Sequence, residues 1–151
     1  EQTEVVIGDG RLSIASEPDG AFGVIVLDAF SSDAIPIHLL TAEALQVYLR
    51  KLTADGMLLI HITNNYLDLG PVVANLAADA GLQARVLENK VWDPSRFRLP
   101  STWAVIAKSD AGLAVLNDSA RRWQPLEPDP DDGVWTDDFS NIVSALRWNP
   151  F

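Results

Sequence analysis

Two continuous apolar runs, with an amphipathic segment between them, constrain the fold of this chain more than any other feature. Residues 22–30 read FGVIVLDAF and residues 57–64 read MLLIHITN, and each has an unbroken apolar centre. Such runs are typical of strands that are covered on both faces, as in a parallel sheet. The pattern therefore predicts an α/β protein.

The segment between the two runs has the features of a helix. Thr41 is a suitable N-cap, and Glu43 lies in the first turn, where a negative charge is favourable. Leucines recur along one helical face at Leu45, Leu49 and Leu52. A strand, a helix and a second strand in this order predict a right-handed crossover between parallel strands.

Further elements follow the second run. Asp68 is a candidate cap for another helix that tolerates Pro71 in its first turn and ends at Gly81. Residues 82–89 and 102–109 have strand patterns, with a loop rich in Pro, Arg and aromatic residues between them. Residues 3–8 are expected to form the first strand, and residues 135–148 a C-terminal helix capped by Thr136, Asp137 or Asp138.

Polar residues follow three of the expected strands. Asp9, Asp28 and Asn64 each stand at the carboxyl end of one. Because ligands of open parallel sheets bind at these ends, we expect the three side chains to face one crevice. Each carboxylate also has a structural interpretation: Asp9, within GDGR, can cap the next segment, and Asp28 can cap the loop after its strand.

A second carboxylate lies near Asp28. Asp33 follows on a loop of small and polar residues, and paired carboxylates can hold a cationic amine and remove its proton. Ser31 and Ser32 either donate hydrogen bonds to a ligand or are ordinary loop serines. No Gly-x-Ser-x-Gly elbow surrounds them, which argues against a serine nucleophile.

The two histidines, His38 and His61, have no partners at metal-ligand spacing, so no metal site is expected. His61 lies inside an expected strand and is predicted to be a core residue. His38 is predicted to lie at the entry of the following helix.

Composition narrows the class of protein. The chain has 151 residues, enough for one domain, and its net charge of −10 disfavours nucleic acid as a partner. It has no cysteine, which excludes disulfides and fits a cytoplasmic location. No signal peptide or apolar run of membrane-spanning length is visible, and the chain does not begin with Met.

Four motifs in order carry a resemblance to a known family. They read VVIGDGRL, VIVLDAFSSDAIPIHLLT, GMLLIHITNNYLDL and VWTDDFSNIVSAL. Together they resemble the spermidine synthase-like family, and most closely the bacterial branch in which this domain is fused to a membrane segment. The resemblance implies a Rossmann-like fold of the S-adenosylmethionine-dependent methyltransferase type, with a three-layer, mostly parallel sheet.

The family's reaction is aminopropyl transfer. The resemblance implies decarboxylated S-adenosylmethionine as co-substrate, a diamine such as putrescine as acceptor, and no tightly bound cofactor. Asp9 and Gly10 match the pair that contacts the adenine, and Asp28 with Ala29 matches the nucleotide-binding and catalytic position. Asp33 matches the aspartate that binds the acceptor, with Ser31 and Ser32 beside it.

The chain departs from the family pattern in two ways. AFSS separates Asp28 from Asp33, where the family has a sequence like Asp-Ser-Ser/Thr-Asp, so the acceptor or the reaction is expected to differ. The glycine-rich loop and the acidic ribose ligand that precede GDGR in the family are absent. Residues 1–151 are therefore predicted to form a single, partial domain that is weak or inactive alone.

The absent elements also have a structural consequence. The family's strand order is 3-2-1-4-5-7-6, and without strands one and two the fourth strand has an open edge. The third strand must then move beside it, pair with another chain, or detach. An open edge favours a homodimer. Three alternatives remain for function: a methyltransferase on the same fold, a non-catalytic domain that binds polyamines or nucleotides, or a structural module.

Overall fold

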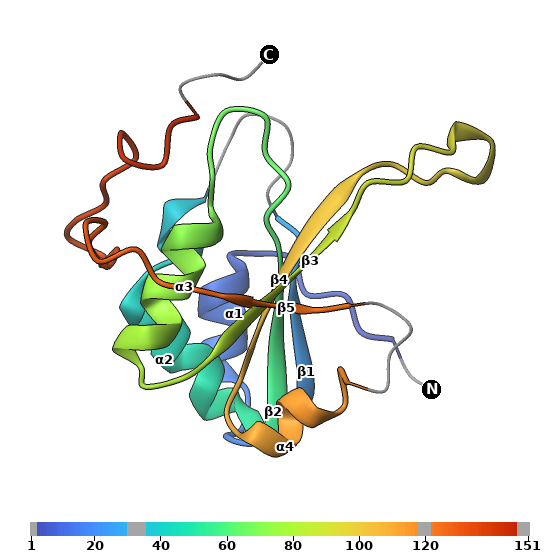
Figure 1. Ribbon diagram of the computed structural model, residues 1–151. Coiled ribbons are helices and arrows are strands. Elements are labelled where there is room, and N and C mark those ends of the chain that lie inside the picture. Colours follow the sequence, from blue (N-terminus) through green and yellow to red (C-terminus); the bar gives the residue numbers. More distant parts are fainter. Residues whose placement is uncertain (1–2, 30–35, 118–121, 148–151) are drawn as a thin grey trace.

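The structure is a computed structural model that describes residues 3–29, 36–117 and 122–147 (Figure 1). The helices and strands alternate along most of the chain, which confirms the α/β class. In chain order they are α1 (Gly10–Ser16), β1 (Phe22–Leu27), α2 (Ala42–Lys51), β2 (Leu52–His61), α3 (Gly70–Asp79), β3 (Ala84–Asn89), β4 (Ser101–Ala107), α4 (Asp110–Ala114) and β5 (Gln124–Leu126). Short 3-10 turns occur at Ile37–Leu39 and Pro94–Arg96.

The five strands form one sheet in the order β1-β2-β4-β3-β5. The first four correspond to the segment 4-5-7-6 of the family's order, in which the last strand inserts between two earlier ones. Only β1 and β2 pair in parallel, and the other three pairings are antiparallel. The expectation of a mostly parallel sheet is therefore wrong in this detail. The antiparallel pairing of β3 with β4 results from the hairpin that joins them, because a chain that turns straight back can only pair antiparallel.

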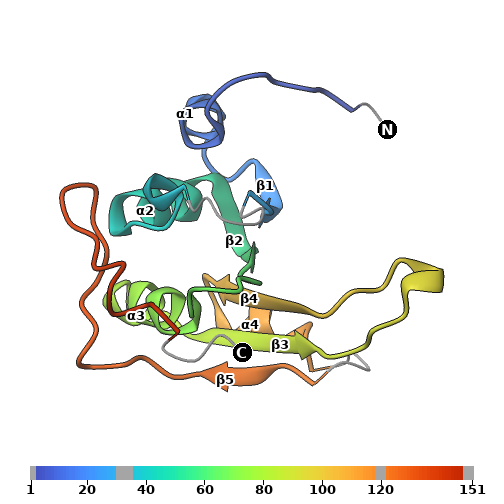
Figure 2. The same ribbon diagram turned by 90° about the horizontal axis from the view of Figure 1, so that it is seen from above.

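Helices cover the two faces of the sheet unequally. Leu58, Ile60 and Ile106 point to the face covered by α2 and α3, where the main core lies, and α1 packs beside α2. Val105 and Ala107, from the opposite face, pack against Leu113 of the short helix α4. Figure 2 shows α1, α2 and α3 grouped on one side of the strands. The chain thus forms three layers, of which the α4 layer is the smaller.

Local signals explain the two central helices. The Thr41 hydroxyl accepts a hydrogen bond from the Ala44 N–H (3.2 Å), as predicted for the N-cap of α2. Asp68 lies one residue before the N-cap of α3, and its carboxylate accepts from the Gly70 N–H (3.1 Å). The turn after α3 uses Gly81 at φ 69°, a conformation that favours glycine.

The expected strand at residues 3–8 is wrong. This segment is extended without strand partners among the described residues, and Val5, Val6 and Ile7 are 81%, 60% and 96% exposed. β-branched residues favour strands only where a neighbouring edge accepts them. The segment therefore does not move beside β1 within this chain, and pairing with another chain stays a prediction.

The strand β1 differs from the buried strand that its apolar run predicts. It pairs with β2 on one side and forms an edge of the sheet on the other. Ile25 packs in the main core, whereas Val24 and Val26 on the opposite face are 50% and 54% exposed. A continuous apolar run thus occurs in a strand with one covered face.

The predicted C-terminal helix is also wrong, because residues 135–147 contain no helix and have a turn only at residues 142–145. Trp135 is buried at 1% exposure, and the Leu146 backbone bridges Leu67. The side chain of Asp137, an expected helix cap, instead accepts hydrogen bonds from Arg11 and Thr41. Long-range contacts of this kind override a local helical pattern.

In the part of the chain that the structure describes, no helix has the length and apolarity that a membrane crossing requires.

Candidate active site

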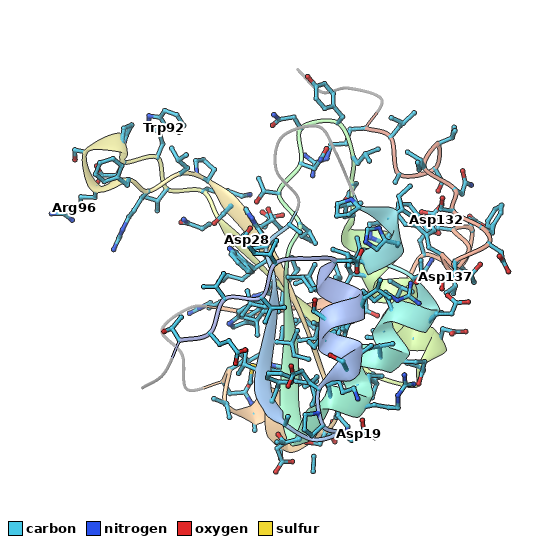
Figure 3. All side chains as sticks on the ribbon, turned by 180° about the vertical axis from the view of Figure 1, so that it is seen from behind. Asp19, Asp28, Trp92, Arg96, Asp132 and Asp137 are labelled. Atoms are coloured by element: carbon cyan, nitrogen blue, oxygen red, sulfur yellow. The ribbon has the colours of Figure 1, made fainter. Side chains whose placement is uncertain are left out.

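Asp28 lies at the carboxyl end of β1, as predicted. In the register of the parallel pair Leu27 lies opposite Ile60, which places Asp28 beside His61 at the end of β2. The Asp28 Oδ1 and His61 Nδ1 atoms are 2.7 Å apart, and the Asp28 side chain is 63% exposed (Figure 3). The carboxylate is therefore held on one side and open to solvent on the other.

His61 lies between Asp28 and an aromatic side chain. It stands directly opposite Trp103 across the β2–β4 pair, and the two rings stack with centroids 4.7 Å apart and an interplanar angle of 16°. Its Nε2 atom is buried, with no hydrogen-bond partner among the described residues. The prediction of a core residue is therefore incomplete, because the pairing of β1 with β2 brings this ring to Asp28 and the pairing of β2 with β4 brings it to Trp103.

Asp9 has the structural role that was considered as its alternative. Its carboxylate accepts a hydrogen bond from the Leu12 N–H (2.9 Å) as the N-cap of α1, and lies 3.0 Å from Nε2 of His38. The Leu12 N–H and the nearby His38 lower the pKa of this carboxyl group. Both oxygens thus have partners, and Gly10 is the first residue of the helix. The adenine contact of Asp9 and Gly10 stays a prediction.

Asn64 has a local partner as well. It is 9% exposed, and its side-chain oxygen accepts from the N–H groups of Tyr66 and Leu67, both at 2.8 Å. The structure therefore does not show Asp9, Asp28 and Asn64 converging on one ligand. Instead, each side chain contacts a different residue or turn.

The other predicted site residues divide into two groups. Ala29 follows Asp28 and is exposed, so it is open to a ligand. Ser31, Ser32 and Asp33 lie outside the described residues, and their roles stay predictions. Among the residues that are described, no group of three His, Cys, Asp or Glu side chains could hold a metal ion.

Asp137 belongs to a separate cluster, well apart from Asp28 (Figure 3). Its two oxygens accept from the Arg11 guanidinium at 2.6 and 2.8 Å, and one also accepts from the Thr41 hydroxyl at 2.8 Å. These hydrogen bonds lower the pKa of Asp137 to about 2. A pocket of ≈ 470 Å³ adjoins the cluster and includes Asp138. Because Asp137 is already paired, it is not a free anion for a cationic ligand.

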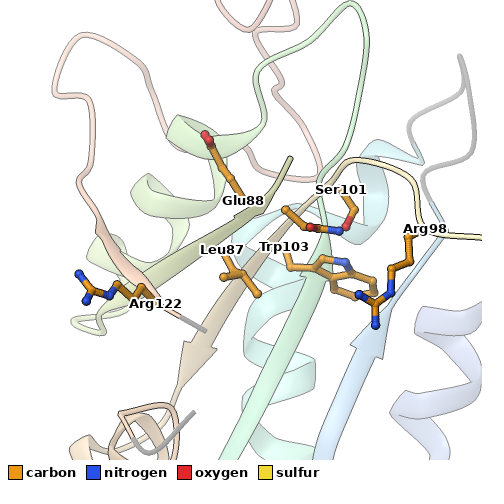
Figure 4. Close-up of a pocket in the computed structure, with 7 residues that line it drawn as sticks. Leu87, Glu88, Arg98, Ser101, Trp103 and Arg122 are labelled. Atoms are coloured by element: carbon orange, nitrogen blue, oxygen red, sulfur yellow. The ribbon is translucent and has the colours of Figure 1, made fainter. Parts of the chain in front are cut away.

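Figure 4 shows a second pocket of ≈ 470 Å³. Trp103 links it to the Asp28–His61 pair, because it lines this pocket and also stacks on His61. In Figure 4 the Arg98 side chain extends towards Trp103. The other lining residues are Leu87, Glu88, Asn89, Ser101 and Arg122. Sequence reasoning identified none of these residues, because they come from a loop and strands without a chemical motif.

Comparison with known proteins shows the fold of the chain. No protein-family model and no curated protein matches it. A solved structure of a probable spermidine synthase from Corynebacterium glutamicum ATCC 13032 is similar, with a TM-score of 0.53 at 16% sequence identity. The similarity covers 81% of this chain but only 47% of that one, so this chain spans about half the length of the similar protein. The chain therefore has a spermidine synthase-like, Rossmann-like fold of the methyltransferase type.

Proposed function

We propose that this chain is a spermidine synthase-like domain whose reaction is the transfer of an aminopropyl group from decarboxylated S-adenosylmethionine to a diamine such as putrescine. The observation that carries the proposal is the Asp28 carboxylate, which is exposed at the carboxyl end of β1 and held by His61 at 2.7 Å. This is the edge of the sheet at which ligands of such folds bind. The spermidine synthase-like fold supports it.

The reaction assigns a clear task to Asp28. The neutral amine attacks the methylene carbon next to the sulfonium, so a C–N bond forms while the C–S bond breaks and methylthioadenosine leaves. The attacking nitrogen must lose a proton, and Asp28 accepts it as the general base. Its negative charge also attracts two cationic substrates to one place. In this proposal Ala29 lies at the nucleotide, and Asp33 with Ser31 and Ser32 holds the acceptor.

The proposal is tested by turnover. Decarboxylated S-adenosylmethionine and putrescine are incubated with the protein, and methylthioadenosine and spermidine are measured by chromatography. Asp28→Asn, which cannot accept the proton, is expected to lower kcat by about 100-fold or more. Asp19→Asn is a matched control, because Asp19 pairs with Lys51, at the far end of α2 from the site. Equal turnover by wild type and Asp28→Asn would contradict the assignment.

Exchanging the donor distinguishes aminopropyl transfer from the methyltransferase alternative. If S-adenosylmethionine, and not its decarboxylated form, supports turnover, the chain belongs to a methyltransferase on the same fold.

A non-catalytic role is favoured by one specific observation: Asp9 is occupied as a helix cap and by His38, rather than open to a nucleotide. The chain also lacks a glycine-rich loop, which would cradle the nucleotide. We therefore expect weak or absent activity from this chain alone. Calorimetry with methylthioadenosine tests this expectation, and micromolar binding would refute it. Polyamine binding without turnover would identify a binding domain.

The proposal also covers the oligomeric state of the protein and its location in the cell. The homodimer is predicted from the open strand edge, and the cytoplasmic location from the lack of cysteine. Attachment to a membrane segment is predicted from the sequence resemblance. The exposed edge of β1 supports self-association, because an unpaired strand edge can pair with another chain.

A further inference from the structure

His61 is the side chain of the sheet that contacts Asp28. It ends β2, the neighbour of β1, and Trp103 of β4 stands opposite it. Three adjacent strands thus place Asp28, His61 and Trp103 in one row. The Asp28–His61 contact is 2.7 Å, and the ring of His61 stacks on Trp103 at 4.7 Å between centroids. The β2 backbone, the stack on Trp103 and the hydrogen bond to Asp28 together hold the His61 ring in place.

We propose that His61 is a positioning residue, which donates a hydrogen bond from Nδ1 to Oδ1 of Asp28 and so presents Oδ2 to the attacking amine. This inference rests on the proposed function. A carboxylate can only accept, so the proton between the two atoms belongs to Nδ1 of the ring. One oxygen of Asp28 is then occupied, and the other stays available on a side chain that is 63% exposed.

The surroundings of the ring explain why it holds this orientation. Trp103 covers one face of His61, and the other ring nitrogen, Nε2, is buried without a partner among the described residues. A flip of the ring by half a turn would keep the stack on Trp103, but it would turn Nδ1 away from Asp28 and lose the short hydrogen bond. A fixed ring in turn restricts Asp28 to few rotamers. General bases need such restriction, because a small misplacement of a reacting group costs about 100-fold in rate.

Two substitutions separate the hydrogen bond from the stack. In His61→Asn the side-chain amide can donate from nearly the same place as Nδ1, but the aromatic ring is lost. In His61→Phe the stack on Trp103 is kept, but no donor remains. If His61 positions Asp28, His61→Phe lowers kcat by about 10- to 100-fold with little change in KM, and His61→Asn restores most of it.

The kinetic comparison is made with variants whose near-ultraviolet circular dichroism shows the wild-type fold. Full activity of His61→Phe, or equal losses in both variants, would overturn the positioning role. If the wild-type chain gives no turnover with any acceptor, as expected for a chain without a glycine-rich loop, the contact is tested by the protonation of the ring instead.

The contact itself has a test that does not depend on turnover. Nitrogen-15 NMR of the wild-type chain reports which ring nitrogen carries a proton, and His38→Asn identifies the signals of His61. A proton on Nδ1 of His61 that is lost or redistributed in Asp28→Ala supports the hydrogen bond. A bare Nδ1 in the wild-type chain would overturn it, whatever reaction the protein catalyses.

Discussion

The Asp137 carboxylate joins residues that lie far apart along the chain. It accepts hydrogen bonds from Arg11 in α1 and from Thr41, the N-cap of α2. Its own N–H donates to Glu43 at 3.0 Å. These bonds hold the C-terminal segment against the N-terminal helices. A charged, bidentate pair of this type has a defined geometry that a single contact lacks.

The Asp137 cluster predicts an acid-dependent loss of stability. The folded chain lowers the pKa of Asp137 from 3.8 to about 2, so it binds fewer protons here than the unfolded chain does. The stabilisation is complete above pH ~4 and is lost as the pH falls towards ~2. The melting temperature of Asp137→Asn should therefore lie below that of wild type at pH 6, and the difference should shrink near pH 2.

A matched variant controls the measurement. Asp138→Asn removes a neighbouring carboxylate that takes no part in these hydrogen bonds, and is expected to show no such pH-dependent difference. A constant difference for Asp137→Asn at both pH values would contradict the role of its charge.

At the scale of the elements, α4 depends on a glycine for its position on the sheet. A Cβ atom on Gly112 would lie 3.0 Å from the Asp55 carbonyl oxygen and 3.1 Å from Cβ of Ala107. The helix thus approaches β2 and β4 more closely than a larger residue allows. This contact closes the smaller face of the sheet over Val105 and Leu113.

Gly112→Ala should therefore destabilise the chain despite the higher helix propensity of alanine. Crowding around the new Cβ lowers the free energy of unfolding by about 1–3 kcal/mol. The higher helix propensity of alanine raises it by about 0.5–1 kcal/mol. Urea unfolding measures the net loss. At Gly133 a Cβ would meet nothing within 4 Å, so Gly133→Ala should leave the midpoint nearly unchanged. A stabilised Gly112→Ala would show that α4 can move outward without cost.

The edge strand β1 makes a prediction about association. Val26 is 54% exposed on this edge, whereas Ile25 is 5% exposed in the core. A lysine on an exposed edge strand opposes pairing with another chain. Val26→Lys should stay folded and reduce self-association in sedimentation velocity, while Ile25→Lys should unfold the chain because it buries a charge. A wild-type chain that stays monomeric at high concentration would contradict the predicted homodimer.

At the scale of the whole molecule, the C-terminal segment completes the main core. Trp135 is 1% exposed and is among the largest fully buried side chains. Its carbonyl oxygen accepts from the Ala42 N–H at 2.8 Å, and the Arg147 N–H donates to the Tyr66 carbonyl at 2.8 Å. A segment without regular secondary structure is thus an integral part of the fold.

Trp135→Ala should cost about 3–5 kcal/mol, because it removes a large buried side chain and leaves a cavity. Urea unfolding measures this loss, and limited proteolysis should show earlier cleavage after residue 126. Trp92 in the β3–β4 hairpin is 69% exposed, so Trp92→Ala is expected to change stability by less than about 0.5 kcal/mol. Similar stability of both variants would contradict the buried role of Trp135.

Local features of the sequence determined most of the helices and strands at the centre of this protein. The apolar runs predicted β1 and β2, and the Thr41 cap with its leucine face predicted α2. Asp28 was correctly expected at the end of its strand. Such signals act over one strand or one helical turn, so they can be read without knowledge of distant residues.

Tertiary structure alone decided which residues meet. The insertion of β4 between β2 and β3, the contact of Asp28 with His61, and the pairing of Arg11 with Asp137 join positions far apart in sequence. Tertiary structure also decided the conformation of residues 3–8 and 135–147, which differs from the expected strand and helix. A segment becomes a strand only when it pairs with a neighbouring strand, and a helix must compete with long-range hydrogen bonds, so the local pattern of these segments could not settle their conformation.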